Sequence, residues 1–136
     1  MTSSVTFFLD NTHPPRFAVV LRALGYDVHH LQEKFEHAST SDVQWMPIVA
    51  KNAWICITGD LRIVKKPQER VVRAEAKLTT VFMPSGFTML KLWPQFELLI
   101  KAWPNIVGAV ERSRPGDCFE VQRNGKVSLA PDLGKP

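Results

Sequence analysis

The stretch VTFFLD, residues 5–10, decides the fold, because a run of apolar and β-prone residues leads directly to an aspartate. A continuous run of this kind predicts a strand that is buried on both faces of a parallel sheet. A similar run, WICIT at residues 54–58, precedes Gly59 and Asp60. The carboxyl ends of parallel strands form the ligand crevice of an open α/β sheet, so Asp10 and Asp60 are expected together at that edge.

Strand and helix patterns alternate along the rest of the chain. Capping residues, proline starts and helical spacing of apolar residues predict helices near 14–24, 41–52, 67–77, 89–103 and 106–112. Further strands are predicted near 26–31 and 79–83, and an Asn-Gly turn between 118–122 and 126–129 predicts a hairpin. Prolines are expected to bend or break the helix at Pro47 and to end another at Pro104. The alternation predicts an α/β fold with a mainly parallel central sheet, helices on both faces and a C-terminal β-hairpin.

Length and composition favour one ordinary globular domain. The chain has 136 residues, of which 45% are hydrophobic and 22% charged. We expect a single domain over 1–130 and a loose C-terminal tail over 131–136. No apolar run approaches the roughly 18 residues of a membrane span, and the N-terminus lacks the pattern of a signal peptide. Two cysteines are too few for a disulfide framework, so a cytoplasmic location is expected.

Positive charge is concentrated in one segment. The chain carries a net charge of +4, and the segment 61–78 holds six basic residues against two acidic ones. The basic residues are Arg62, Lys65, Lys66, Arg70, Arg73 and Lys77. A cationic flank next to acidic strand ends favours a polyanion such as RNA or DNA, although a solvated helix face is the alternative explanation.

A third aspartate, Asp42, is expected near the other two. Ser41 and Gln44 form a capping-box pattern that places Asp42 in the first turn of a helix. Two carboxylates 4 Å apart repel by about 4 kcal/mol at an effective dielectric near 20, so such a cluster usually requires a cation with oxygen ligands, commonly Mg²⁺. Each acid also has a structural explanation, as an Asx-turn, a helix start or a turn residue.

These residues resemble the PIN-like nucleases, in particular the small VapC-type toxins. The resemblance covers about residues 5–83, and the later part of the chain is a looser match. It depends on the order of four short features: FLDN at 8–11 with Pro14 and Pro15, RFAVVLRALGYD at 16–27, Ser41-Asp42, and ITGD at 57–60. The resemblance implies a PIN-like three-layer α/β/α fold.

The resemblance also implies a function: a Mg²⁺- or Mn²⁺-dependent endoribonuclease, often a toxin neutralised by a cognate antitoxin protein. Asp10, Asp42 and Asp60 would then hold the metal and form the catalytic site. The predicted substrate-binding residues are Asn11, Arg16, Thr58, Lys65 and Lys66. The chain departs from the family pattern at two positions. Many relatives have an acid directly after the first aspartate, where this chain has Asn11, and a second aspartate near the third acid, where this chain has Arg62.

Two other classes of function remain open from the sequence. A signalling receiver also has aspartates after its first and third strands, but it needs a second acid at the place of Asn11 and a lysine after a fifth parallel strand. A catalytically silent binding module could use the apolar stripe from Met89 to Trp103 in a homodimer or to bind an antitoxin. Trp45 or Trp54 could stack an RNA base, although core positions are the more common use of such tryptophans.

Overall fold

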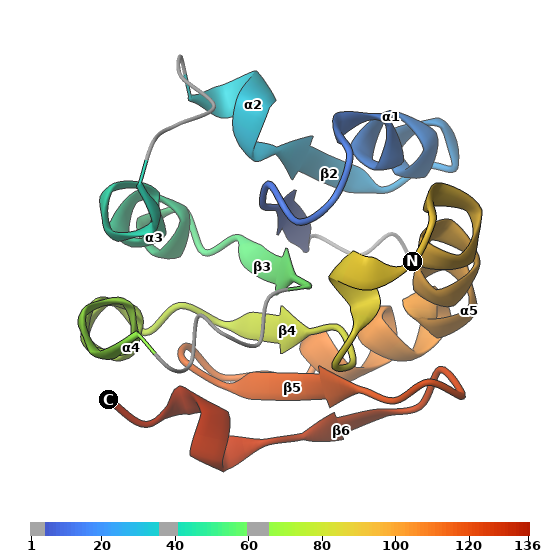
Figure 1. The fold of residues 1–136 in the computed structure, drawn as a ribbon. Helices are drawn as coiled ribbons and strands as arrows, with labels where there is room; N and C mark the ends of the chain where they lie inside the picture. The colour runs from blue at the N-terminus through green and yellow to red at the C-terminus, as the bar shows by residue number, and fades with distance from the viewer. Residues whose placement is uncertain (1–4, 36–40, 60–65) are drawn as a thin grey trace.

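The computed structural model describes residues 5–35, 41–59 and 66–136, and it contains a six-stranded sheet with helices on both faces (Figure 1). The strands are β1 (Thr6–Leu9), β2 (Asp27–His30), β3 (Ile55–Thr58), β4 (Thr80–Phe82), β5 (Cys118–Val121) and β6 (Val127–Leu129). The helices are α1 (Pro15–Ala23), α2 (Leu31–Lys34), α3 (Asp42–Lys51), α4 (Pro67–Ala76) and α5 (Leu92–Val110). The short 3-10 helices η2 (Phe87–Met89) and η3 (Pro131–Gly134) follow β4 and β6.

The sheet is mainly parallel, as predicted from the alternation of strands and helices. Its strand order is β2-β1-β3-β4-β5-β6, and all neighbours pair in parallel except β5 and β6. The predicted hairpin is confirmed, because β5 and β6 pair antiparallel across the Asn-Gly turn. The strand β5 additionally pairs in parallel with β4, so the hairpin extends the central sheet.

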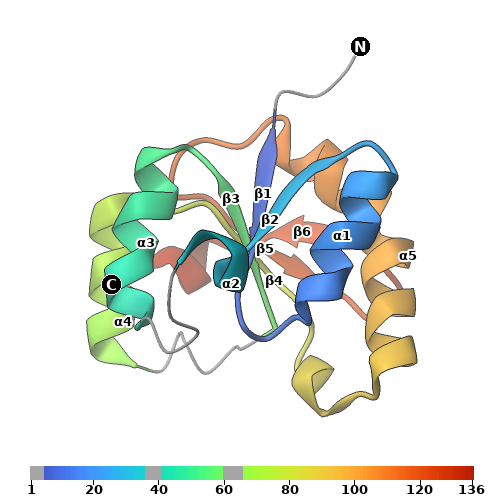
Figure 2. The same cartoon turned by 90° about the horizontal axis from the view of Figure 1, so that it is seen from above.

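Two helical layers cover the two faces of the sheet, with α1 and α5 on one side and α3 and α4 on the other (Figure 2). Alternate residues of each strand serve these two layers. Phe7 and Leu9 of β1 belong to the hydrophobic cluster that includes α1 and α5, whereas Phe8 belongs to the cluster with α3. The continuous apolar runs of the sequence therefore arise because both faces of the sheet are buried.

Local sequence signals place several helix ends as expected. Pro15 occupies the first turn of α1, and Gly25, just after this helix, has a φ of +99° that favours glycine. Ser41 and Gln44 form the predicted capping box at the start of α3. The short helix α2 was not predicted; it begins where the His30 side chain accepts a hydrogen bond from the backbone N–H of Gln32.

The helix expected near 41–52 is confirmed and is not broken at Pro47, whereas the helix end expected at Pro104 is wrong. The helix α3 continues through Pro47 to Lys51, and α5 continues through Pro104 to Val110, so no separate helix begins at residue 106. Both prolines lie on exposed faces, where water can bond the carbonyl that loses its helical partner.

The C-terminal residues differ from the loose tail that was expected. Residues 131–134 form η3, and its Leu133 packs against the cluster on the α3 and α4 side of the sheet. The Leu133 carbonyl accepts a hydrogen bond from the Arg73 guanidinium. The backbone N–H of Ala130 donates to the Cys118 carbonyl at 2.7 Å, which further fixes this end of the chain to β5.

Candidate functional site

The carboxyl ends of β1 and β3 lie side by side where the strand order reverses. The chain passes from β1 to β2 on one side, and it later returns to β3 on the other side of β1. Asp10 directly follows β1, Thr58 ends β3, and the parallel register pairs Leu9 with Ile57 just before them. Ligands of open α/β sheets bind at such a switch point, so Asp10 lies at the predicted edge.

Asp10 is a buried carboxyl group that is held by its own loop. It is 4% exposed, and its Oδ1 accepts hydrogen bonds from the backbone N–H of Thr12, at 3.0 Å, and from the Thr12 hydroxyl. The Thr58 side chain also hydrogen-bonds the Asp10 side chain. The Thr12 hydroxyl oxygen in turn accepts from the backbone N–H of Gly59 at 2.7 Å. One threonine therefore connects the loop after β1 to the end of β3.

Burial raises the pKa of Asp10 from 3.8 to about 6, because the charged carboxylate loses its hydration. The hydrogen bonds from Thr12 and Thr58 lower this pKa and offset part of the rise. The negative charge of Asp42 raises it further. The ionised form of Asp10 is therefore poorly solvated, and a cation next to it would stabilise that form.

Asp42 is the first residue of α3 and lies half-buried. Its Oδ1 accepts a hydrogen bond from the indole N–H of Trp45 at 2.9 Å, which fixes the carboxylate relative to the helix. The charge of Asp42 raises the pKa of Asp10 and also that of the Cys56 thiol in β3. Such effects fall with distance, so they agree with a position of Asp42 on the side of α3 toward β1, and the sharing of one metal site by Asp10 and Asp42 stays a prediction.

Asp60, the third predicted acid, lies outside the described residues, as do Arg62 and Lys65. Within the described ranges, no group of three or more His, Cys, Asp or Glu side chains is placed to hold a metal ion. The described donors are therefore the carboxyl groups of Asp10 and Asp42, and the predicted three-acid site depends on Asp60, which follows the buried Gly59 directly.

The predicted substrate-binding residues differ in accessibility. Asn11, Arg16 and Lys66 are exposed, and Asn11 accepts a hydrogen bond from the Gln32 side chain at 3.1 Å. Lys66 precedes α4, and its Nζ lies 3.7 Å from a carboxylate oxygen of Glu69. Thr58 is fully buried and contacts Asp10, so its hydroxyl orients the acid. Contacts of Asn11, Arg16, Lys65 and Lys66 with a substrate stay predictions.

Two residues with a suggested role on the surface lie in the core. Trp45, considered for base stacking, is fully buried, and its ring packs 5.1 Å from that of Phe8. Arg73, counted in the basic segment, is 2% exposed and lies with its guanidinium 5.2 Å from the centre of the Phe82 ring. The cationic flank therefore does not include Arg73, because α4 turns this side chain toward the sheet and η3.

Sequence analysis did not identify Thr12 or the close packing around Gly59. A Cβ added at Gly59 would lie 2.6 Å from a ring carbon of Phe87 and 3.3 Å from the Thr12 hydroxyl oxygen. Glycine is therefore required here so that the end of β3 can approach both η2 and the loop after β1. The ITGD motif contained this glycine, but its sequence gives no indication of which residue it contacts.

His30 was also missed as a residue that supports the loop after β1. Its Nδ1 accepts from the backbone N–H of Gln32, and its Nε2 donates to the His13 carbonyl at 2.6 Å. This pair of bonds requires a neutral imidazole with its proton on Nε2, and burial lowers the pKa of His30 accordingly. His30 thus fixes the carbonyl of a residue that lies three positions after Asp10.

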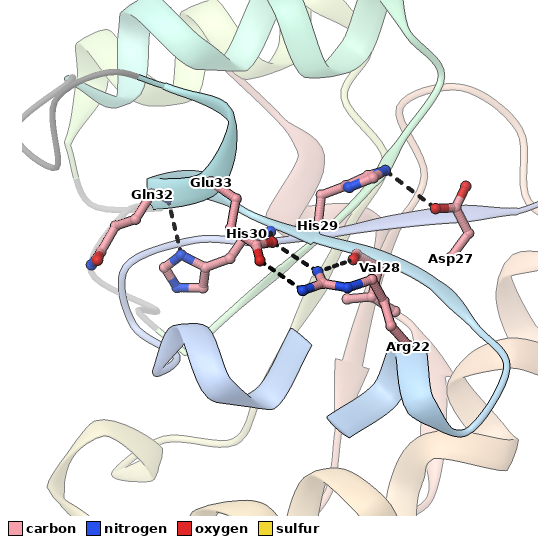
Figure 3. A network of polar contacts seen from close by, with 7 residues as sticks. All are labelled: Arg22, Asp27, Val28, His29, His30, Gln32 and Glu33. Atoms are coloured by element: carbon pink, nitrogen blue, oxygen red, sulfur yellow. Dashed lines mark hydrogen bonds and ion pairs between the residues drawn. The ribbon is translucent and has the colours of Figure 1, made fainter. Parts of the chain in front are cut away.

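A polar network anchors His30 from the opposite side (Figure 3). The backbone N–H of His30 donates to Glu33, and Arg22 of α1 binds both carboxylate oxygens of Glu33 at 2.7 and 2.8 Å. Arg22 also donates to the Val28 carbonyl at 2.8 Å. The network therefore joins α1, β2 and α2 behind the candidate site, where an exposed ion pair fixes geometry more than it adds stability.

A family model described as a PIN like domain matches residues 5–85, which include β1 through β4 and the predicted site residues Asp10 and Asp42. The chain belongs to this PIN-like family. Its sheet and helical layers agree with the PIN-like α/β/α fold that the sequence motifs predicted. No curated protein and no solved structure matches the chain.

Other class predictions can be compared with the fold. The first five strands have the order β2-β1-β3-β4-β5, which receivers share with other switch-point folds, so the strand order does not separate the receiver-like alternative from the PIN-like fold. The chain does have a fifth parallel strand, but the residues after β5 are Gln122 and Arg123 rather than a lysine. Among the described helices, none is long and apolar enough to cross a membrane.

Proposed function

We propose that the chain is a metal-dependent endoribonuclease, and that it is the toxin of a toxin–antitoxin pair. The observation that supports this most is the buried Asp10 at the switch point of a PIN-like fold, with a pKa of about 6 that the charge of Asp42 helps to raise. A desolvated carboxylate with a raised pKa is typical of a functional site rather than of a strand end alone.

Two of the proposed ligands have the oxygen chemistry that a hard cation takes. Asp10 and Asp42 supply carboxylate oxygens, and the unfavourable desolvation of Asp10 is the kind that a bound cation relieves. Mg²⁺ commonly keeps several waters and needs few carboxylates, and Mn²⁺ accepts the same ligands. We infer that Asp10 and Asp60 hold the ion and that Asp42 completes the site.

The other residues of the site would act on geometry and binding. Thr12 and Thr58 hold the Asp10 carboxylate in one orientation. A bound metal ion would polarise the phosphate and lower the pKa of a water, which is its usual contribution to phosphodiester hydrolysis. The exposed cations Arg16 and Lys66 are suited to contact backbone phosphates on either side of the cleaved bond, and Asn11 and Lys65 are proposed to assist them.

The decisive test compares RNA cleavage by Asp10→Asn, Asp42→Asn and Asp60→Asn with cleavage by Asp132→Asn. Asp132 is a matched control because it is a highly exposed aspartate on η3, with its side chain 90% exposed. With Mn²⁺ or Mg²⁺ present, we expect at least a 100-fold loss of cleavage for the three site variants and full activity for the control, with EDTA silencing the wild type. Cleavage that persists in EDTA, or in Asp10→Asn, would contradict the proposal.

The toxin assignment has a separate test. If the chain is a toxin acting on cytoplasmic RNA, its induced expression should stop growth, and Asp10→Asn should relieve the arrest at equal protein levels. A cognate antitoxin protein should restore growth when co-expressed. Cleavage in vitro without any growth effect would leave a ribonuclease and remove the toxin role.

A further inference from the structure

The apolar stripe predicted along α5 divides into a buried part and an exposed part. Leu99 and Trp103 are buried in the core. Met89, Leu92 and Trp93, at the other end, are 86%, 42% and 68% exposed. We call these three residues the Trp93 platform. A large exposed indole next to a methionine and a leucine is an unusual surface for a small globular protein and points to a binding role.

The Trp93 platform begins next to the candidate site. Phe87 of η2 lies against Gly59, at the end of β3, where a Cβ would come within 2.6 Å of its ring. The Phe87 ring also packs 5.2 Å from the ring of His13, in the loop after Asp10. Met89 follows Phe87 by two residues, so the platform starts within about 7 Å of backbone from the residue that touches both sides of the site.

Hydrogen bonds hold the Trp93 platform in a fixed position. The Gln95 side chain, which is 8% exposed, donates to the Phe87 carbonyl at 3.1 Å and connects the first turns of α5 to η2. The backbone N–H groups of Met89 and Leu90 donate to the carbonyls of Gly86 and Phe87 at 3.0 and 3.1 Å. The exposed ring of Trp93 is therefore carried by a rigid segment, which favours stacking at low entropic cost.

The charge around the Trp93 platform suits an anionic ligand. No residue from 76 to 96 is acidic. Lys91 lies between Met89 and Leu92 in the sequence and is exposed. Arg123 donates to the Ser85 carbonyl at 3.0 Å, which brings its guanidinium to the start of η2. An open hollow continues along α5 from Pro94, and its lining includes the cations Lys101 and Arg123 and one acid, Glu97.

We propose that the Trp93 platform stacks an unpaired base of a single-stranded RNA whose backbone continues into the candidate site. This inference depends on the proposed ribonuclease function and adds a base-stacking residue, Trp93, outside the acidic site. Stacking needs only an exposed aromatic face, with cations nearby to hold the phosphates. Trp93, Lys91 and Arg123 provide these groups, whereas the buried Trp45 does not.

A second copy of the chain is the less suitable occupant. A large side chain presents roughly 150–250 Å², so the exposed parts of the three platform residues together offer on the order of 400 Å². A stable interface buries about 800 Å² on each partner, and the platform alone falls well short of this. A single stacked nucleotide needs no more apolar surface than Trp93 and Met89 expose.

The test measures RNA affinity without cleavage. A short unstructured fluorescein-labelled RNA is titrated with protein in EDTA and followed by anisotropy, with a duplex of the same sequence in parallel. We expect Trp93→Ala to weaken single-strand binding about tenfold and Trp93→Phe to weaken it less than threefold, because phenylalanine keeps a stacking face. Leu24→Ala is the matched control, since Leu24 is an apolar residue just after α1 that is 61% exposed and lies outside the platform.

The outcomes separate this inference from the proposed function. Unchanged affinity in Trp93→Ala, with cleavage by the wild type intact, would overturn the platform and leave the ribonuclease. Weakened binding in Trp93→Ala, together with a wild type that never cleaves RNA, would support the platform and remove the ribonuclease. Equal affinity for duplex would overturn stacking of an unpaired base on Trp93. Sedimentation velocity is run on the same variants, and a dimer that Trp93→Ala dissociates would assign the platform to self-association instead.

Discussion

Asp10 and Arg73 are both buried charged side chains, but Asp10 follows the strand β1 and Arg73 lies on the helix α4. Asp10 is 4% exposed at the carboxyl end of β1, and burial raises its pKa to about 6. Arg73 is 2% exposed on α4, and burial lowers the pKa of its guanidinium. In both cases the protein interior disfavours the charged form.

The partners of the two side chains separate a candidate functional group from a structural one. Arg73 donates to the Leu133 carbonyl and stacks on Phe82, so it connects α4, β4 and the C-terminal η3. Asp10 is held by Thr12 and Thr58, which belong to its own site, and the charge of another acid, Asp42, raises its pKa. Burial of a charge is therefore common to both, and the position at the strand ends identifies Asp10 as the functional candidate.

The largest change in stability is expected from Arg73→Ala. This substitution removes a buried side chain, its contact with Phe82 and the hydrogen bond to Leu133, so unfolding should become easier by about 3 kcal/mol. Arg73→Met refills most of the space without a buried charge, and we expect a loss of about 1 kcal/mol. Urea unfolding followed by tryptophan fluorescence measures both.

Arg112→Ala is the matched control for Arg73, because Arg112 is an exposed arginine after α5. Its loss should change the unfolding free energy by less than about 0.5 kcal/mol. If Arg73→Met destabilised the protein as much as Arg73→Ala, the guanidinium itself would be required, and the structural part of the comparison would need revision.

Unlike Arg73→Ala, the substitution Asp10→Asn should increase the stability of the protein above neutral pH. The native pKa of about 6 lies above the ordinary value of 3.8, so the folded state binds the proton more tightly. The contribution of this proton to the free energy of unfolding is fully present below about pH 4. It is lost as the pH rises through 6, and the total loss is at most about 3 kcal/mol. Replacing the carboxylate by a neutral amide should therefore stabilise the protein by about 2 kcal/mol at pH 8 and change little at pH 4.

The response to metal ions is a second measurement on the Asp10→Asn variant. In the wild type, Mn²⁺ should raise the unfolding temperature at pH 8, because a cation offsets the buried charge, and Asp10→Asn should lose this response. A gain in stability for Asp10→Asn that is equal at pH 4 and pH 8 would mean that the charge of Asp10 is not its cause. The functional side of the comparison would then fail.

The layered fold was predictable because its signals are local and repeated. Buried runs at 5–9 and 54–58, the capping box at Ser41 and the Asn-Gly turn each determine one element, and together they define the sheet. The sequence was less informative about which face of α5 is buried. Trp93 and Trp103 were assigned to one stripe, but ten residues at 100° each leave them about 80° apart on the helix. The structure buries Trp103 and exposes Trp93.

The site was predictable in part, for a similar reason. Strand ends indicated the edge where Asp10 lies, and the capping box indicated the position of Asp42 in the first turn of α3. Thr12, Gly59 and Arg73 could not be assigned, because their roles depend on contacts between segments that are far apart in the chain. The Thr12 hydroxyl meets the N–H of Gly59 across 47 residues, and Arg73 meets Leu133 across 60.

The smallest expected effect, from Thr12→Val, sharpens the comparison through its pH dependence. Valine matches threonine in shape but leaves the Gly59 N–H without its acceptor, so stability should fall by about 1–2 kcal/mol at pH 4.5. Asp10 also loses the hydroxyl that lowers its pKa, so its native pKa should rise further. The variant should therefore continue to lose stability above about pH 7, where the wild type has reached a plateau. Urea unfolding between pH 4.5 and 8 measures this, with the exposed Thr88→Val as control; parallel curves for Thr12→Val and wild type would show that Thr12 does not act on the ionised Asp10.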